Sequence, residues 1–441
     1  MTKIALIVLD TLRKDVFDEY FDWLPGKRFE SAFSTSHWTV PAHASLFTGQ
    51  YASDVGAHAK NQSLNYDGPV LAESLSDAGY QTLAFSANGH IGPYFEFDRG
   101  YDEFRCDSSK YNNALFRWSE HLSGGYKSVL DAPVALLRSI KGEYDTIASI
   151  KNGYQHLCRD YPFLPDPEPT GARKALSFIE DQNFQEDSFL FMNLMEMHSP
   201  YKPPRKYRRM RYSGEDIENK GMFTFTGEHM ESRNVWQAYK DCARYVSDIF
   251  QKIFHQLESF DYIITLSDHG ESFGEEGVWG HPYGLHPAIT NVPLIISGPS
   301  RSRSTCMTPV NLLDIYTTIM SIAELESNTA GHSLIGGILS HACLTEYHGI
   351  THAEKLEKVR EAVQDEQMVQ AYDEPRFGLA LNPNYYGYES IDGYKSEGEA
   401  EIEQDPLAVL ATLKSGRPSL SRDQPEFDDD VRSQLEKLGY L

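Results

Sequence analysis

The chain has 441 residues, enough for one large domain with an appendage or for two or three domains of ordinary size. Hydrophobic residues make up 40% of it and aromatic residues 12%, which supports a buried core and argues against intrinsic disorder. No apolar run approaches the roughly 18 residues of a membrane-spanning helix. The 64 acidic and 40 basic residues give a formal net charge of -24, which repels nucleic-acid phosphates. We therefore expect neither a membrane span nor a nucleic-acid partner.

The N-terminal apolar run, residues 4–9, ends at Asp10 and is too short for the core of a signal peptide. We interpret it as a buried first strand. The cysteines are odd in number and include no CxxC pair, so no disulfide framework is predicted. They are Cys106, Cys158, Cys242, Cys306 and Cys343. Both features favour a cytoplasmic location.

Short apolar or β-branched runs that end at polar residues predict the strands. These runs are residues 4–9, 82–86, 189–195, 262–266 and 292–296. Between them, helical spacing of apolar residues predicts helices over 70–78 and 235–257. Near-continuous apolar strands that alternate with helices indicate an α/β fold, with a mostly parallel central sheet sandwiched by helices. In such sheets the site lies at the carboxyl ends of the strands.

The chain is predicted to divide into a catalytic domain, residues 1–335, and a smaller C-terminal α+β subdomain, residues 336–441. An insertion over about 107–169, with a helical run near 129–140 and a proline-rich turn at 165–169, is expected to cover the site. In the C-terminal part the sequence predicts a charged helix, short antiparallel strands and a closing helix. These lie at 353–371, 385–403 and 431–441.

The segment 39–49 carries the strongest local signal for chemistry. Thr39 precedes Pro41, residues 42–47 favour a helix, and Gly49 ends it. Thr39 is therefore expected at or beside a helix N-terminus, where free amides and the helix dipole favour an anion. The alternative is a plain N-cap threonine.

Polar residues at other strand ends could join Thr39. Asp268 and His269 follow one predicted strand and Asp10 ends another, and such residues can ligate one divalent cation. The alternatives are surface polar residues and a turn aspartate. Further polar residues occur near other strand ends and in loops, where each histidine alone is more often structural. They are Asn88, His90, His198, His281 and His286.

Taken in order, these segments resemble the sulfatase branch of the alkaline phosphatase superfamily over most of residues 3–325. The segment Thr39-Val40-Pro41-Ala42-His43, followed by Leu46-Phe47-Thr48-Gly49, is similar to the sulfatase signature Cys (or Ser)-x-Pro-Ser-Arg and its following leucine and Thr-Gly. Leu9-Asp10-Thr11-Leu12-Arg13 resembles the first metal strand. Residues 267–271 resemble the second metal strand, and residues 279–281 resemble the substrate loop that follows it. Residues 292–295 resemble the next strand.

This chain departs from the sulfatase pattern at several positions. Sulfatases oxidise the signature Cys or Ser to formylglycine, but Thr39 has a methyl group on its carbinol carbon and cannot yield that aldehyde. His43 stands at the signature Arg, and Thr11 at a second acid. His269 stands where many sulfatases have Asn and where phosphonate-ester and phosphoethanolamine-transfer relatives have His. Asn88 and His281 stand where sulfatases often have Lys. The ligand set resembles single-metal lipid-phosphate transferases and phosphodiesterases, which use threonine directly as nucleophile.

The resemblance implies a metal-dependent ester hydrolase with one divalent ion (Ca, Mn, Mg or Zn). The implied ligands are Asp10, Thr39, Asp268 and His269. Thr39 would attack phosphorus or sulfur and form a covalent ester, which water then hydrolyses with His198 or His281 as base. His281 and His198 would contact the reacting group as catalytic residues. Asn88 and His286 would bind the substrate, and His90 and His43 would do so in a lesser role.

The implied substrate is an anionic ester, linked to a sugar or a lipid. A phosphate ester is favoured over a sulfate ester, because a phosphothreonine intermediate is ordinary chemistry for this superfamily. Few lysines or arginines lie in the matched motifs, which points to a singly charged diester or a sulfate. The alternatives are a transferase that passes the group to a sugar or lipid acceptor, and a degenerate, noncatalytic binding protein. The oligomeric state is left open.

Overall fold

The computed structural model describes residues 1–106, 131–141, 146–147, 149–150, 153–154, 171–210, 220–228, 232–338, 341–351, 353–382, 384–398, 405–418 and 420. Most of the predicted insertion at 107–169, including its turn at 165–169, lies outside the described residues, as does the predicted closing helix at 431–441. Within the insertion, α6 (Asp131–Lys141) matches the helical run expected near 129–140.

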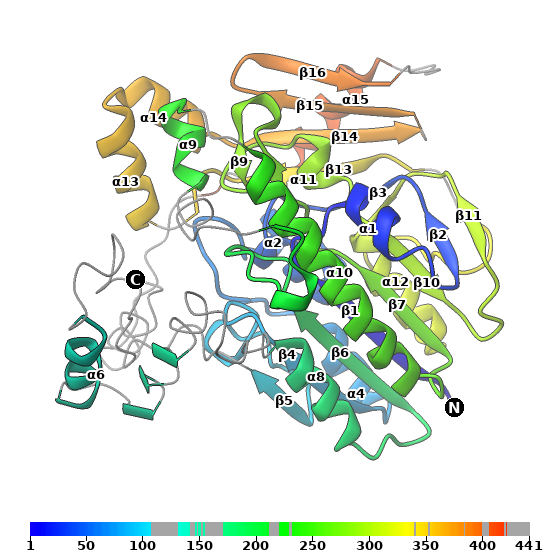
Figure 1. The fold of residues 1–441 in the computed structure, drawn as a ribbon. Coiled ribbons are helices and arrows are strands. Elements are labelled where there is room, and N and C mark those ends of the chain that lie inside the picture. The colour runs from blue at the N-terminus through cyan, green and yellow to red at the C-terminus, as the bar shows by residue number, and fades with distance from the viewer. Residues whose placement is uncertain are drawn as a thin grey trace.

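A central sheet forms the middle layer of the molecule, with strand order β11-β2-β10-β7-β1-β6-β4-β5 (Figure 1). The strands are β1 (Lys3–Leu9), β2 (Lys27–Phe29), β4 (Gln81–Ser86), β5 (Glu103–Cys106), β6 (Ser188–Leu194), β7 (Tyr262–Leu266), β10 (Leu294–Ser297) and β11 (Ser304–Cys306). From β5 to β7 all neighbours are parallel, whereas β10 runs antiparallel to β7 and β2. The predicted mostly parallel α/β sheet is confirmed.

Side chains of β1 alternate between two hydrophobic cores, which explains why the strand is apolar throughout. Ile4, Leu6 and Val8 point into one core, and the residues between them point into the other. Each such side chain, fully buried, contributes roughly 1.5–3 kcal/mol. Both faces of the sheet must therefore be covered.

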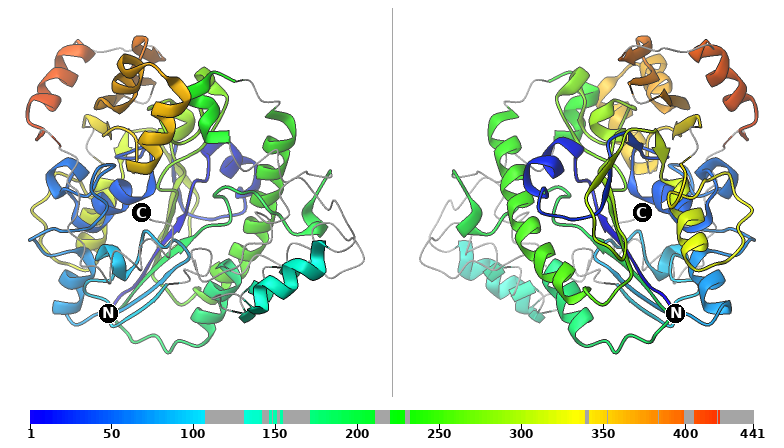
Figure 2. Two further views of the ribbon diagram at one scale, coloured as in Figure 1. Left: turned by 90° about the vertical axis from the view of Figure 1, so that its left-hand side faces the viewer. Right: turned by 90° about the vertical axis from the view of Figure 1, so that its right-hand side faces the viewer.

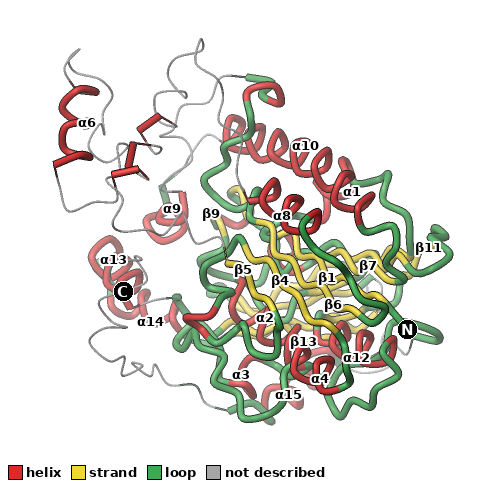
Figure 3. Tube along the Cα trace, turned by 90° about the horizontal axis from the view of Figure 1, so that it is seen from below, coloured by secondary structure: helices red, strands yellow, loops and turns green. Residues whose placement is uncertain are grey.

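Helices cover the two faces, as the view from below shows (Figure 3). One layer holds α1 (Lys14–Tyr20), α8 (Gly171–Glu180) and α10 (Ser232–Gln256). The other holds α2 (Thr39–Thr48), α4 (Leu71–Asp77) and α12 (Leu313–Ile322). The predicted helices at 70–78 and 235–257 correspond to α4 and α10. Among the described residues, no helix has the length and apolar character needed to span a bilayer.

The C-terminal elements gather at the end of the molecule opposite the N-terminus (Figures 1 and 2). A separate antiparallel sheet contains β13 (Cys343–Tyr347), β14 (Arg376–Asn382), β15 (Tyr385–Ser390) and β16 (Gly393–Glu397). Three helices accompany it, α13 (Ala353–Val363), α14 (Glu366–Asp373) and α15 (Pro406–Ser415). Short antiparallel strands after residue 385 are confirmed, whereas β14 was not foreseen.

Short elements complete the described chain. They are β3 (Ala32–Phe33), α3 (Ala52–Val55), η1 (Pro93–Phe95), η3 (Arg205–Tyr207), α9 (Lys220–Thr226), β8 (Ser272–Phe273), η4 (Glu275–Gly277), β9 (Trp279–Gly280), α11 (Pro287–Thr290) and β12 (Val310–Asn311).

The single helix predicted over 353–371 is wrong, because the chain breaks it into α13 and α14. Gln364, between them, adopts a left-handed backbone conformation with φ of 54°. Asp365 then caps α14 by accepting hydrogen bonds from the main-chain amides of Gln367 and Met368. A strong N-cap inside an amphipathic run thus starts a new helix.

Gln364→Gly should raise the free energy of unfolding by about 0.5–1 kcal/mol, because glycine adopts a positive φ without the Cβ penalty. Gln367→Gly, in the first turn of α14, is the matched control and should lower stability by about 0.5–1 kcal/mol. Chemical denaturation of both variants measures the difference. A loss of stability in Gln364→Gly would contradict the strain assigned to residue 364.

Candidate active site

Polar side chains meet where adjacent parallel strands of the central sheet end. Asp10 follows β1, Asp268 follows β7, Asn88 follows β4, and Asn193 lies near the end of β6. Because these strands are neighbours in the order β7-β1-β6-β4, their carboxyl ends share one edge. All four side chains are buried.

Asp10 is held by the side chains around it. Its Oδ2 accepts hydrogen bonds from Asn88 Nδ2 at 2.9 Å and from Asn193 Nδ2 at 3.4 Å. Its Oδ1 accepts one from the Thr11 hydroxyl at 2.6 Å. Asn88 Oδ1 in turn accepts the main-chain N–H of His90 at 3.0 Å. Asn88 was expected to bind substrate. Its side-chain nitrogen and oxygen instead form hydrogen bonds that orient Asp10 and the following loop.

Asp268 presents an unpaired oxygen to the same space. Its Oδ1 accepts the main-chain N–H groups of Thr11 at 3.2 Å and His269 at 3.0 Å. Its Oδ2 is buried and has no hydrogen-bond partner among the described residues. That oxygen lies 3.5 Å from Nε2 of His269 and 3.7 Å from Nδ1 of His43. A buried acceptor without a partner is costly, so this oxygen is available to ligate a cation.

The electrostatics of this cluster favour a bound cation. Burial raises the pKa of Asp268, and the charge of Asp10 raises it further. Burial also acts to raise the pKa of Asp10, but His198, His269 and the hydrogen bonds outweigh it and hold it at about 2. Burial lowers the pKa of His269, yet the two carboxylates raise it above its usual value. The carboxylates therefore draw positive charge to one point.

The donor set fits a divalent metal ion. Ligand atoms of Asp10, Asp268 and His269 all lie within 4.8 Å of one another. His269 Nδ1 contacts the carbonyl oxygen of Gly270 at 2.9 Å, which fixes the proton on Nδ1 and leaves the Nε2 lone pair facing the cluster. Two carboxylates and one imidazole suit Mg²⁺, Mn²⁺, Ca²⁺ or Zn²⁺.

Thr39 reaches this cluster from the first turn of α2. Its hydroxyl lies 3.2 Å from Nε2 of His269, and its side chain is buried. The residue at the N-cap is Trp38, which makes no side-chain cap hydrogen bond. Thr39 is therefore not the cap threonine of the alternative interpretation. The helix dipole and the first-turn amides instead favour negative charge at its hydroxyl.

His43 packs behind Thr39, one helical turn along α2. Its Nδ1 donates to the carbonyl oxygen of Thr39 at 2.9 Å, and its Nε2 accepts from Asn193 Nδ2 at 3.1 Å. Both ring nitrogens are thereby used within the protein, and burial lowers the pKa of the ring. Direct substrate binding by His43, expected from the sequence, would require one of these contacts to be released.

His281 lies beside His269 and is oriented by an acid that sequence analysis did not single out. Its Nδ1 contacts Oε1 of Glu271 at 2.9 Å, and the ring centroids of His281 and His269 are 4.4 Å apart. The Tyr201 hydroxyl donates to the other oxygen of Glu271. Burial lowers the pKa of His281 to about 4, although Glu271 opposes this. A neutral ring that donates from Nδ1 keeps its Nε2 as a proton acceptor.

The remaining expected histidines lie at different distances from the cluster. The His198 ring centroid is 5.4 Å from that of His281. The buried His90 ring packs near Trp38, and burial lowers its pKa to about 4. His286 instead caps α11, accepting from the Ala288 amide at 3.1 Å. No contact among the described residues brings His286 to the metal-ligand candidates.

Lys355, on α13, adds a positive charge that the motifs did not include. It lies within electrostatic range of Glu271 and of His37. Burial lowers the pKa of Lys355 to about 8, and the Glu271 charge acts in the opposite direction. Lys355 is far in sequence from the matched motifs, so no motif pointed to it.

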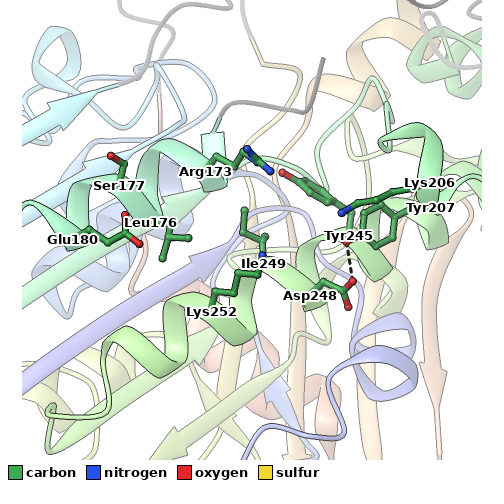
Figure 4. A pocket seen from close by; sticks show the side chains of 10 residues that line it. All are labelled: Arg173, Leu176, Ser177, Glu180, Lys206, Tyr207, Tyr245, Asp248, Ile249 and Lys252. Carbon is green, nitrogen blue, oxygen red and sulfur yellow. Dashed lines mark hydrogen bonds between the residues drawn. The ribbon is translucent and has the colours of Figure 1, made fainter. Parts of the chain in front are cut away.

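A second hollow lies away from this cluster. It is a polar cavity of about 260 Å³ bounded by α8, η3 and α10 (Figure 4). Its lining includes both basic residues, Arg173 and Lys252, and acidic residues, Glu180 and Asp248. None of the expected catalytic residues lines it, so it carries no part of the site.

Comparison with known proteins identifies the family. A sequence profile of the Sulfatase family matches residues 20–325. The chain belongs to the sulfatase family. It is similar to the uncharacterized sulfatase YidJ of Escherichia coli (strain K12), with 24% identity over 331 residues, or 68% of this chain and 61% of that protein. It is also similar to the choline-sulfatase of Rhizobium meliloti (strain 1021), with 24% identity over 70% of this chain and 64% of that protein.

These matches span less than two thirds of either relative. Among solved structures, a phosphonate monoester hydrolase from Silicibacter pomeroyi superimposes with a TM-score of 0.61 at 17% identity, covering 94% of each chain. At that identity the likeness shows the fold, which is that of sulfatases and the alkaline phosphatase superfamily. The fold expected from the resemblance is confirmed.

Gly270 lets the site form because the sulfatase-like motif passes very close to α11. A Cβ atom on Gly270 would lie 2.1 Å from the main-chain oxygen of Ala288. Gly270→Ala should therefore lower stability by about 1–3 kcal/mol and reduce activity, since the flanking His269 and Glu271 would shift. The control is Gly337→Ala, where a Cβ meets no atom within 4 Å. Equal stability of the two variants in thermal unfolding would contradict this interpretation.

Proposed function

We propose that this chain is a metal-dependent ester hydrolase of sulfatase type that uses Thr39 as its nucleophile. The observation that carries the proposal is the buried Thr39 hydroxyl, which lies 3.2 Å from Nε2 of His269. The unpaired oxygen of Asp268 lies 3.5 Å from that same nitrogen. Membership in the sulfatase family supports hydrolysis of an ester. A helix cap or a structural ion pair would not require the unpaired carboxylate oxygen.

One divalent ion would be held by Asp10, Asp268 and His269, with the Thr39 oxygen beside them. Such an ion polarises the ester and lowers the pKa of a coordinated hydroxyl group. Asn88 and Asn193 fix Asp10, while Gly270 fixes the tautomer of His269. The chain thus provides an oriented set of ligands in a dry site.

The chemistry that these residues support has two displacements. First, the Thr39 oxygen, without its proton, attacks the phosphorus or sulfur atom, and the ester bond to the alcohol breaks. His198 donates a proton to the departing alcohol. Second, water attacks the Thr39 ester while His281 Nε2 accepts a proton from that water. The Thr39–ester bond breaks, the free oxyanion leaves, and the Thr39 oxygen is restored without its proton, as it began. His281 then releases its extra proton to solvent, and His198 regains one from solvent.

Glu271 supports His281 in this second displacement. Its carboxylate receives the Nδ1–H of His281 and the Tyr201 hydroxyl, so the imidazole is held in one tautomer. Glu271 would act like the acid of a Ser-His-Asp triad, which orients the catalytic histidine without itself taking the proton. His281 is thereby favoured over His198 as the base.

We infer that the substrate is an anionic ester, with a phosphate ester favoured over a sulfate ester. Threonine cannot form the formylglycine of sulfatases. A phosphothreonine intermediate, by contrast, is readily hydrolysed at a metal-assisted site. The relatives divide on this question, since one is called a choline-sulfatase and one neighbour a phosphonate monoester hydrolase. A sugar or lipid leaving group and a cytoplasmic location stay predictions.

Thr39→Ala should abolish turnover of a bis-aryl phosphate diester while lowering stability by only about 1 kcal/mol, the value of one hydrogen bond. Thr39→Ser should retain activity. Thr48→Ala is the matched control at the other end of α2, because Thr48 also loses a buried hydroxyl bond, to Ala44 O at 2.7 Å, and should keep full turnover. Undiminished turnover in Thr39→Ala would overturn the nucleophile assignment.

The same assays decide the substrate class. Wild-type enzyme should hydrolyse the phosphate diester faster than an aryl sulfate, and mass spectrometry of an acid-quenched reaction should find a phosphoryl group on Thr39. A sulfate ester hydrolysed in preference would favour the sulfatase alternative. Added alcohols that capture the group as a new ester would indicate a transferase.

Lys355 should make substrate binding depend on pH. Because burial lowers the pKa of Lys355 to about 8, its positive charge is present below that pH and is lost above it. The KM for an anionic substrate should therefore rise above about pH 8, and Lys355→Arg should suppress the rise. Lys358→Met, on the exposed side of α13, is the control and should leave KM unchanged. An unchanged KM in Lys355→Met would exclude this role.

A further inference from the structure

A second group of metal-ligand side chains lies outside the candidate active site. It contains Asp314 in the first turn of α12, His332 in the loop after that helix, and His341 just before β13. The first residue of β13, Cys343, lies next to His341. The group therefore joins α12, which packs on the central sheet, to the C-terminal sheet.

The spacing of the donor atoms is that of a small metal shell. His341 Nε2 lies 3.3 Å from Asp314 Oδ2, and His332 Nδ1 lies 4.0 Å from Asp314 Oδ1. One ligand atom from each of the three residues falls within 4.8 Å of the other two. Ligands in a tetrahedral zinc site stand about 3.3–3.8 Å apart, from bond lengths of about 2.0–2.3 Å.

The two imidazole rings are aligned on the same carboxylate. They stack with centroids 4.4 Å apart and planes 30° apart. The Nδ1 atom of His332 is buried and has no hydrogen-bond partner among the described residues, although its side chain is 41% exposed. An unpaired imidazole nitrogen close to a buried carboxylate is available to ligate a metal ion.

Asp314 is held in place independently of the histidine rings. Its Oδ2 accepts the main-chain N–H of Asn311 at 2.8 Å and its Oδ1 accepts the main-chain N–H of His332 at 2.7 Å. Each oxygen retains a second lone pair, so the amides orient the carboxylate and still allow it to ligate. The Cys343 sulfur lies 3.7 Å from His341 Nε2, beside the group but outside the three residues whose ligand atoms all lie within 4.8 Å of one another.

Two histidine–carboxylate pairs outside the candidate active site do not show this convergence. His255 contacts Glu258 on the exposed face of α10, and His348 contacts Glu346 in the interior. Neither pair belongs to a three-residue ligand group among the described residues. The group at Asp314 is therefore more than a single hydrogen-bonded pair.

We propose that Asp314, His332 and His341 form a structural zinc site, with the Cys343 thiolate as fourth ligand. Its donor set, one carboxylate, two imidazoles and a sulfur, suits Zn²⁺ rather than Mg²⁺ or Ca²⁺. All four ligands come from the protein, so the site is closed and structural. Zinc there fastens β13 to α12.

Zinc stoichiometry tests the proposal in the full chain. Protein loaded with Zn²⁺ and dialysed should retain two equivalents by elemental analysis, and Asp268→Ala, which disables the candidate active site, should retain one. In that background, His332→Asn with His341→Gln should retain none. His255→Gln is the matched control and should leave the count unchanged. An equal zinc count with and without the His332 and His341 substitutions would overturn the proposal.

Two further measurements keep the test decisive if the double variant folds poorly. His332→Asn alone changes a partly exposed side chain and should weaken zinc binding by at least about tenfold, because even substitutions behind metal ligands cost about 10–100-fold. Added Zn²⁺ should raise the thermal midpoint of Asp268→Ala but not of its His332→Asn derivative. An equal rise in both would contradict the site.

Cobalt substitution tests the fourth ligand. Co²⁺ bound to Asp268→Ala protein should show a thiolate-to-cobalt charge-transfer band that Cys343→Ser removes. A tetrahedral cobalt spectrum without that band would show that Cys343 is not a ligand. These readouts measure metal binding and not turnover, so their failure leaves the proposed hydrolase intact, and a failed hydrolase assay leaves them intact.

Discussion

The close approach of Asp10 and Asp268 is the constraint on which the rest of the candidate site depends. β1 and β7 are parallel neighbours, with Val8 opposite Leu266, so both strands deliver a buried acid to the same point. Thr11 bridges the acids, because its amide donates to Asp268 and its hydroxyl to Asp10. Two carboxylates buried together would repel each other strongly, and a cation is the means by which proteins keep such a pair charged.

The loop before α2 then places the Thr39 hydroxyl beside His269. The Ser34 hydroxyl donates to the main-chain oxygen of Asp268, so the loop is tied to the end of β7. A few residues later α2 begins, and Thr39 meets His269 across the cluster. His43, on the next turn, links the Thr39 carbonyl to Asn193 on β6. The hydroxyl is thereby positioned by β7, which leads to Asp268, and by β6, which pairs with β1.

The sequence predicted the parts of this arrangement that are local. Apolar runs ending at Asp10 and Asp268 located the strand ends, and the proline and glycine around α2 located Thr39. It did not predict Asn193, which lies within an apolar strand and is distinguished only by the strand order that places it beside Asp10. Nor could it predict Lys355, since its proximity to Glu271 depends on how distant segments pack.

The C-terminal region also reaches the site through backbone contacts, so it is more than an appendage. The Glu346 amide donates to the Thr35 carbonyl, and the Ser36 hydroxyl donates to the Glu346 carbonyl. β13 therefore extends along the segment that leads into α2. Because β13 begins at Cys343, three residues before Glu346, anything that fixes Cys343 to α12 also restrains the loop before Thr39. A zinc ion at Asp314 would thus restrain the segment that leads to Thr39, the proposed nucleophile, without contacting the substrate.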